Sequence, residues 1–253
     1  MMRRFRQAAA GTANLAIAGV MCLRFCNSAH KVVLLLAIGI ILMCVGYYRP
    51  WAIRSVKAID SANEINDQSW FDAAYRDGVR LYVAHAVKWG TCEPWEKAEP
   101  QLAMALKAGI KIALYTRDPN CWQNGIRAAG ALRDHLQFFA LDIESDPGVP
   151  ATAAMVAGVR AMGVRPVIYS GSGMWPMFMR EHAAAFSGVP LWDCDARPEA
   201  HREWAGDILS PAPVAYGGWN THGNMRVGVQ QAFEYSMRGI AVDLNSFDET
   251  FLR

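Results

Sequence analysis

The stretch QFFALDIESDPGVPATAAMVAGVRAMGVRPVIYS (137–170) decides the fold, because it holds one complete strand–helix–strand unit. Its ends, QFFALDIE (137–144) and VRPVIYS (164–170), are rich in aromatic and β-branched residues and are typical of buried strands. The Ala-rich segment between them is typical of a helix, and it stops at Gly163. Since a helical crossover joins parallel strands, this unit predicts a parallel sheet.

The same alternation extends in both directions along the chain. Four more runs have strand character: VKAID (56–60), VRLYVAHAV (79–87), IKIALYT (110–116) and VPLWDCD (189–195). Helical segments follow the first three: SWFDAAYRDG (69–78), AEPQLAMALKAG (98–109) and NGIRAAGALRDH (124–135). Beyond residue 195, three runs predict strands joined by short turns: VAYGGW (214–219), MRVGVQQAFEY (225–235) and IAVDLNSF (240–247). A closed barrel fits this order better than an open sheet. We therefore expect an α/β fold, an irregular TIM-like (β/α) barrel over 56–253 with about five βα units followed by about three strands.

Acidic residues stand where these strands end, which in such barrels is the functional face. Asp60 ends the first strand, and Asp142 and Glu144 end the fourth. Residues two apart on a strand point to the same side, so Asp142 and Glu144 should share the barrel mouth. Asp243 lies on the last strand and becomes a neighbour of Asp60 once the barrel closes. Strand six adds Asp193 and Asp195.

Such a carboxylate cluster suits the cleavage of glycosidic bonds. Like charges in a poorly solvated cleft raise one another's pKa, and a protonated carboxyl beside an ionised one is what this reaction requires. Aromatic residues near the same strand ends could stack on sugars: Tyr115, Tyr169, Trp192 and Trp219. For any one acid the alternative is a helix cap or an ion pair, and for any one aromatic it is core packing. His85, inside an apolar run, is interpreted as a buried core histidine.

The segment 56–253 resembles the lysozymes of glycoside hydrolase family 25, which are muramidases. Matching segments occur in the same order: AIDSANEIN (58–66), FFALDIE (138–144), VRPVIYS (164–170), VPLWDCD (189–195) and AVDLNSF (241–247). The family's barrel is similarly irregular, with five βα units and then three strands, so the resemblance implies the same architecture.

The resemblance also implies roles for individual residues. Glu144 would be the general acid, and Asp142 would orient the substrate acetamido group that attacks the anomeric carbon. Asp60 and Asp243 would support this charge arrangement. Substrate binding would fall to Tyr115, Tyr169, Trp192, Trp219, Gln230 and Asn245. The bond cut would be the β-1,4 link from N-acetylmuramic acid to N-acetylglucosamine in peptidoglycan glycan strands, with no metal and no cofactor.

Three segments depart from the family's pattern. They are Lys88 to Cys92, Tyr115-Thr116-Arg117, and Val229-Gln230-Gln231. Arg117 could serve a substrate carboxylate or pair with a neighbour. Because these changes touch substrate subsites, two alternatives stay open. One is an inactive or divergent module that binds cell-wall glycan, and the other is a metal-dependent enzyme in which Asp142, Glu144 and Asp243 hold Mg²⁺.

The N-terminal region predicts a membrane anchor. Val32 to Tyr48 carries no charge and as a helix would span roughly 26 Å, close to the thickness of a bilayer core. We expect a basic cytoplasmic tail (1–31), a transmembrane signal anchor (32–48), a short linker (49–55) and an extracytoplasmic barrel.

The charge and the cysteine content limit which partners and which cellular compartment the protein can have. Residues 1–57 contain eight Lys or Arg and no Asp or Glu, so the rest of the chain has a net charge of −6, which argues against nucleic acid as a partner. Three cysteines fall in the barrel: Cys92, Cys121 and Cys194. Outside the cytoplasm, Cys92 and Cys121 could form a disulfide, and three free thiols are the alternative.

Overall fold

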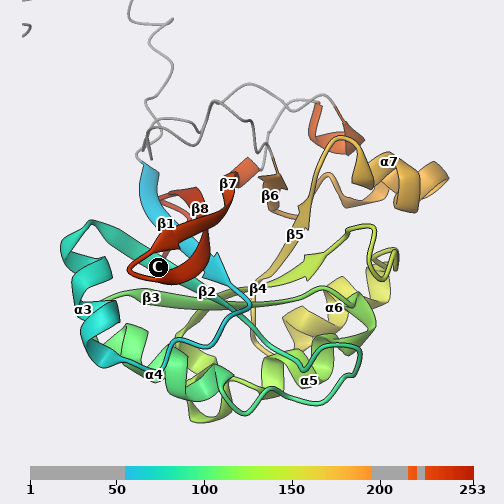
Figure 1. The fold of residues 1–253 in the computed structure, drawn as a ribbon. Helices are drawn as coiled ribbons and strands as arrows, with labels where there is room; N and C mark the ends of the chain where they lie inside the picture. The colour runs from blue at the N-terminus through green and yellow to red at the C-terminus, as the bar shows by residue number, and fades with distance from the viewer. Residues whose placement is uncertain (1–54, 195–215, 221–225) are drawn as a thin grey trace, which may run out of the picture. The chain divides into compact units, whose positions relative to one another are not determined.

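The protein is represented by a computed structural model, which describes residues 55–194, 216–220 and 226–253. Eight strands form a closed barrel and are paired in chain order (Figure 1). They are β1 (Ser55–Ser61), β2 (Val79–His85), β3 (Lys111–Thr116), β4 (Leu136–Asp142), β5 (Pro166–Ser170), β6 (Leu191–Cys194), β7 (Arg226–Met237) and β8 (Ile240–Asp248). The predicted α/β barrel is thus confirmed.

Strand direction divides the barrel into two parts. Strands β1 to β7 pair in parallel with their neighbours, whereas β8 is antiparallel to both β7 and β1. Five helices connect the first six strands: α3 (Gln68–Arg76), α4 (Ala98–Lys107), α5 (Trp122–Arg127), α6 (Ala153–Ala161) and α7 (Met174–Met179). The expected order of five βα units followed by three strands is therefore confirmed.

Local sequence signals explain where three of the helices begin or end. The Asp67 and Thr152 side chains cap α3 and α6 by accepting hydrogen bonds from backbone N–H groups. Gly109 and Gly163 follow α4 and α6 with positive φ, a conformation that glycine adopts without strain. Four short 3₁₀ helices complete the described secondary structure: Pro119–Cys121, Gly130–His135, Arg180–Phe186 and Gly217–Asn220.

Two sequence expectations need correction. The helix predicted over 124–135 is two helices, because α5 ends at Arg127 and a 3₁₀ helix begins at Gly130, whose φ of +52° is incompatible with a continuous right-handed helix. The strand predicted over 214–219 is absent from its described part, where Gly217–Asn220 forms a 3₁₀ helix. Gly217 has a φ of +57°, and the buried Tyr216 and Trp219 rings pack together, so this segment turns instead of extending.

The expected tail and anchor, 1–31 and 32–48, lie outside the described residues. Strand β1 begins at Ser55, the last residue of the expected linker 49–55. Within the described part of the chain, no helix is both long and apolar enough to cross a membrane.

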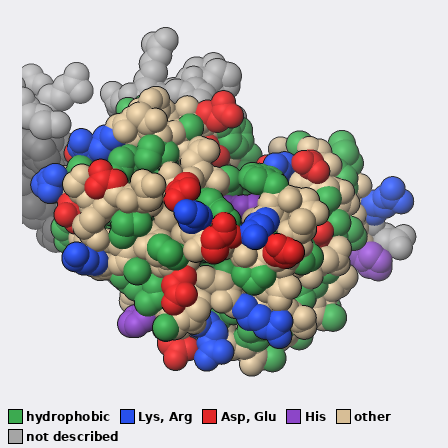
Figure 2. All heavy atoms as spheres, turned by 60° about the horizontal axis from the view of Figure 1, so that its bottom comes forward, with side chains coloured by type: hydrophobic (Ala, Val, Ile, Leu, Met, Phe, Trp, Pro, Cys, Tyr) green, Lys and Arg blue, Asp and Glu red, His purple; other side chains and the backbone are tan. Residues whose placement is uncertain are grey.

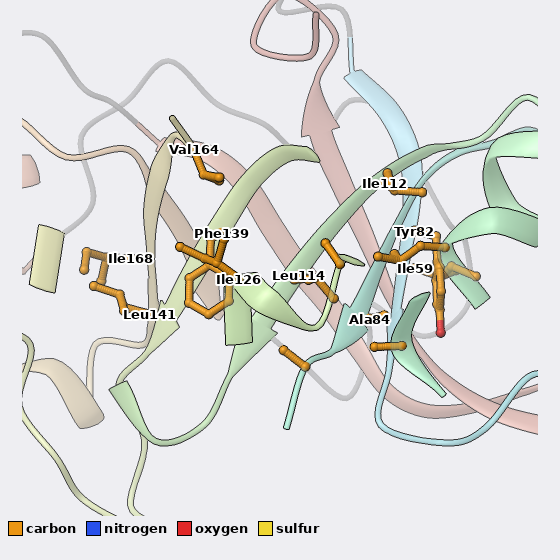
Figure 3. Close-up of a cluster of buried hydrophobic side chains, with 14 of the residues drawn as sticks. Ile59, Tyr82, Ala84, Ile112, Leu114, Ile126, Phe139, Leu141, Val164 and Ile168 are labelled. Carbon is orange, nitrogen blue, oxygen red and sulfur yellow. The ribbon is translucent and has the colours of Figure 1, made fainter. Parts of the chain in front are cut away.

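The hydrophobic core has two layers that follow the alternation of each strand. On β2, Tyr82 and Ala84 belong to the layer between strands and helices, whereas Leu81 and Val83 belong to the layer inside the barrel. Figure 3 shows the outer layer, in which side chains from several strands meet Ile126 of α5. The inner layer is closed by three large aromatic side chains, Phe138, Trp192 and Phe247, so the barrel is filled and is not a pore.

Phe138 should be a main contributor to stability. Its ring is fully buried and stacks on Phe247 at 5.4 Å between centroids. We expect Phe138→Ala to lower the free energy of unfolding by about 3–5 kcal/mol, as is usual for a large side chain removed from a core. Met177→Ala on α7 is the control, because Met177 is 60% exposed and its loss should change stability by at most about 0.5 kcal/mol. Urea denaturation measures both, and equal effects would contradict the assignment of Phe138 to the core.

Candidate active site

A pocket of about 310 Å³ opens at the mouth of the barrel where the parallel strands end. Five acidic residues line it: Asp60, Asp142, Glu144, Glu234 and Asp243. Five aromatic residues line it as well: Trp89, Tyr115, Tyr169, Trp192 and Phe233. The four acids expected from the strand ends are therefore brought together. A second hollow of similar volume adjoins the pocket, sharing Ala62, Asn63 and Trp89 with it.

Barrel closure places Asp60 beside Asp243. Asp60 lies near the end of β1, and Asp243 lies near the beginning of β8. Because β8 runs antiparallel to β1, the two residues are direct register partners. The strand that reverses direction thus delivers its acid to the same mouth as the parallel strands.

Asp142 and Glu144 both line the pocket, as their spacing predicts. Ile143 between them is buried in the outer core and donates its backbone N–H to the Tyr169 carbonyl. Asp142 is 3% exposed, and its Oδ1 has no hydrogen-bond partner among the described residues. Glu144 is partly exposed, with Oε1 lying 3.5 Å from the Tyr169 hydroxyl. The pair thus combines a deeply buried carboxyl with one that substrate can reach.

Gln230 links the separate acids into one network. Its Nε2 donates to Asp60 Oδ1 at 3.1 Å and to Asp243 Oδ2 at 3.0 Å. Its Oε1 accepts a hydrogen bond from the Tyr169 hydroxyl. The amide is therefore committed to protein partners, and Gln230 organises the carboxylates although it also lines the pocket.

Asn245 lies beneath this network and is fully buried. Its Nδ2 donates to Asp60 Oδ1 at 2.7 Å, and its Oδ1 accepts from the Trp192 indole at 2.8 Å. Trp192 therefore serves the site twice, since its ring lines the pocket and its N–H orients the amide that supports Asp60.

Burial raises the pKa of each of the four acids. Burial is the largest cause for Asp60, Asp142 and Glu144, and the charge of Asp243 raises the pKa of Asp60 further. The Arg117 guanidinium opposes this effect at Glu144. The pKa of Asp243 rises to about 6, again mainly through burial. The site can therefore hold protons on carboxyl groups near neutral pH.

Two loops at the rim are joined by a disulfide between Cys92 and Cys121, which resolves the question that the sequence left open. Cys194 keeps its thiol. Asn124 also donates to the Cys92 carbonyl at 2.8 Å. The first loop carries Trp89 and the second follows Arg117, so both residues are held in place at the pocket.

Other residues singled out from the sequence lie elsewhere. Trp219 is 1% exposed, donates its indole N–H to the Val189 carbonyl and packs on Trp175, away from the pocket. Asp193 is buried in an ion pair with Arg226. Asp195 falls outside the described residues. His85 is buried as expected, and it stacks on Trp89.

Phe233 and Glu234 were missed by sequence reasoning. The pairing of β7 with β8 shifts register between Ala232 and Tyr235, and Glu234 has a φ of +50°. This irregularity turns both residues toward the pocket. The sequence carries no glycine or proline there that could signal the bulge.

Within the described ranges, one group of three His, Cys, Asp or Glu residues brings its ligand atoms within 4.8 Å of one another: Cys92, Asp118 and Cys121. The two cysteines are bonded to each other, so their sulfurs are not thiolate ligands. Asp142, Glu144 and Asp243, the expected alternative Mg²⁺ ligands, do not form such a group. The surface shown in Figure 2 intersperses acidic and basic side chains, and this face carries no continuous basic patch.

Solved structures share this fold. A muramidase from Trichobolus zukalii aligns with 76% of this chain and 93% of its own, at 18% identity and a TM-score of 0.53. A muramidase from Acremonium alcalophilum aligns over the same shares at 17% identity and a TM-score of 0.50. An uncharacterized B. stearothermophilus protein aligns with 78% of this chain and all of its own, at 14% identity and a TM-score of 0.53. No family model and no curated protein matches the chain. At such low identity, the likeness shows the barrel fold alone.

The buried acids should make the fold less stable as pH rises. A raised pKa in the folded state means that the folded protein binds protons more tightly than the unfolded chain. The contribution of Asp60 protonation to the free energy of unfolding is thus complete below the ordinary Asp pKa of 3.8. It is lost as pH rises through the pKa that Asp60 has in the folded protein. Asp60→Asn keeps an acceptor for Gln230 and Asn245 but cannot ionise. We expect its melting temperature to exceed that of the wild type at pH 8 and the gap to close toward pH 4.

Asp134→Asn is the matched control, because the Asp134 side chain is 85% exposed and lies outside the pocket. Its melting temperature should follow that of the wild type across the same range. If the difference in melting temperature between Asp60→Asn and the wild type grew as the pH fell, the pKa of Asp60 would be lowered in the folded protein and not raised.

Proposed function

We propose that the barrel is an N-acetylmuramidase that hydrolyses the β-1,4 bond between N-acetylmuramic acid and N-acetylglucosamine in peptidoglycan. The observation that carries this proposal is the pairing of a substrate-accessible carboxyl whose pKa is raised by burial, Glu144, with a buried carboxyl, Asp142, whose Oδ1 has no protein donor within the described residues. An acetamido N–H of a bound sugar is a donor of the kind that this oxygen lacks.

The resemblance in sequence and the shared fold of two muramidases support the same assignment. The aromatic lining offers faces for sugar rings, and the adjoining hollow over Trp89 gives a polymeric substrate room beyond one sugar.

In the proposed reaction, Asp142 accepts the acetamido N–H and orients the carbonyl oxygen toward the anomeric carbon. This oxygen attacks as the glycosidic bond breaks, and Glu144 gives its proton to the departing oxygen, which leaves as a hydroxyl group. The ring formed is an oxazolinium ion. Water then adds to the anomeric carbon, Glu144 takes a proton from it, and the acetamido group is released. The configuration is retained, and no electron is gained or lost.

In this scheme, Asp60 and Asp243 stabilise the positive charge of the intermediate and do not contact the bond that breaks. Asp60 is 5% exposed and is held by Gln230 and Asn245. Its negative charge, when present, favours the cationic oxazolinium, because the surrounding protein screens it poorly.

Replacing Glu144 should slow turnover strongly. We expect Glu144→Gln to lower kcat by about 10²–10⁴-fold, the usual contribution of a general acid. The measurement uses the full chain, purified in mild detergent, on purified peptidoglycan, with new N-acetylmuramic acid reducing ends counted by mass spectrometry. Glu96→Gln is the control, because Glu96 lies on the exposed loop outside the pocket.

Each other result has a defined meaning. Sacculus binding by both proteins without cleavage would favour a glycan-binding module. Loss of wild-type activity in EDTA would favour the metal-dependent alternative.

We also propose that the barrel works outside the cytoplasm behind the anchor at 32–48. The Cys92–Cys121 disulfide supports this location, because disulfides persist in oxidising compartments. Thiol trapping in cells tests it. In the full chain, the thiols of Cys92 and Cys121 should become reactive only after a reductant is added. When residues 32–48 are deleted, both thiols should be reactive without the reductant. A Cys92→Ser, Cys121→Ser double variant is the control, and reduced Cys92 and Cys121 in the full chain would contradict the proposal.

A further inference from the structure

Arg117 follows β3 and lies beside the general acid of the proposed function. Its Nε is 3.5 Å from Glu144 Oε2, and its Nη2 is 3.8 Å from Asp146 Oδ2. Among the described residues that line the pocket, it is the one Lys or Arg side chain. Arg117 is therefore the side chain that can bind a negatively charged group of the substrate in this part of the pocket.

The polar contacts of Arg117 leave hydrogen-bonding capacity for a ligand. The two ion-pair contacts are longer than good charge-assisted hydrogen bonds, and the buried Nε has no hydrogen-bond partner within the described residues. The Asp146 side chain is 80% exposed, so water screens its attraction to Arg117. The guanidinium therefore lies at the pocket and can still donate hydrogen bonds to a ligand.

The Arg117 guanidinium lies over an aromatic stack at the rim of the pocket. Its central carbon lies 5.1 Å from the centre of the Trp89 ring, whose other stacking partner is His85 at 4.6 Å between centroids. The Cys92–Cys121 disulfide ties the two loops together. Burial, and then the Arg117 charge, lowers the pKa of His85 to about 4, so His85 stays neutral and Arg117 is the cation of this stack.

We propose that Arg117 binds the free lactyl carboxylate of N-acetylmuramic acid and makes the enzyme selective for glycan strands that have lost their peptides. This inference rests on the proposed function. The lactyl group and the anomeric carbon belong to the same sugar, so a group that reads one must lie close to the acid that serves the other. In peptide-bearing strands the lactyl carboxyl is an amide and carries no charge. The reaction that supplies the substrate is then an amidase-type hydrolysis of the bond between lactyl group and peptide.

The protonation state of Glu144 makes Arg117 available. When Glu144 carries its proton, Arg117 loses the attraction of that carboxylate and can bind the incoming anion through two N–H groups. The bound anion then offsets the tendency of Arg117 to ionise Glu144. Four other carboxyl groups, those of Asp60, Asp142, Asp146 and Asp243, interact electrostatically with Glu144, and the Tyr169 hydroxyl lies beside it. None of these groups is a cation.

The test compares two tetrasaccharides of alternating N-acetylglucosamine and N-acetylmuramic acid, one with free lactyl carboxylates and one with lactyl primary amides. The two ligands are equal in size and differ in charge. The full chain is assayed for kcat/KM on both, and its Kd is measured for thioglycoside-linked versions that resist cleavage. We expect a preference of about 10- to 100-fold for the free acid, the usual range for a hydrogen bond to a charged group.

Arg117→Gln should abolish this preference, and Arg117→Lys should keep part of it because the point charge remains. Arg80→Gln is the matched control. Arg80 also stacks on an aromatic ring, that of Tyr75 at 4.1 Å, but it lies at the beginning of β2 outside the pocket, so the preference should be unchanged.

The outcomes separate the two proposals. Equal kcat/KM on both ligands would overturn the role of Arg117 and leave the muramidase intact. A binding preference that Arg117→Gln removes, with no turnover by the wild type, would overturn the muramidase and leave the carboxylate site intact. A preference that survives Arg117→Gln, or a shift of the pH profile that is equal on both ligands, would make Arg117 only a positioning residue for Glu144. Binding of neither ligand would overturn both.

Discussion

The antiparallel pairing of β8 with β1 is the constraint on which the site depends. It closes the barrel and sets Asp60 opposite Asp243. If β8 ran parallel to β1, Asp243 near its beginning would lie at the other end of the barrel. The closing hairpin also carries Gln230 and Asn245, which reach from β7 and β8 to Asp60. One reversal of chain direction therefore assembles both an acid pair and the amides that hold it.

The acid cluster lies above an apolar barrel floor. Phe138, Trp192 and Phe247 fill the interior below the pocket, and this low-polarity layer raises the free energy of every ionised carboxyl above it. Gln230 and Asn245 supply donors that offset part of this effect at Asp60. Asp142 lacks such a donor at Oδ1. Of these two buried carboxyls, Asp142 is therefore the one at which a ligand can supply a missing hydrogen-bond donor.

Sequence reasoning recovered what local patterns encode. The strands, the helices that end before Gly109 and Gly163, and the acids at the strand ends all follow from short-range signals. Three features depend on tertiary contacts that no local pattern records. Trp219 looks like a pocket aromatic until its packing on Trp175 is known. The bulge that turns Phe233 toward the pocket has no glycine or proline to mark it. The commitment of Gln230 to its neighbours depends on barrel closure.

Arg117 presents a conflict that indicates its use. A guanidinium close to Glu144 favours the ionised form, whereas a general acid has to hold its proton. A neutral side chain would serve the acid better if Arg117 acted on Glu144 alone. In the structure, the Arg117 guanidinium instead lies over Trp89, which stacks on His85, and the Cys92–Cys121 disulfide joins the two loops beside it. An anion that arrives with the substrate removes the conflict, because its charge cancels the effect of Arg117 at the moment when the proton of Glu144 is needed.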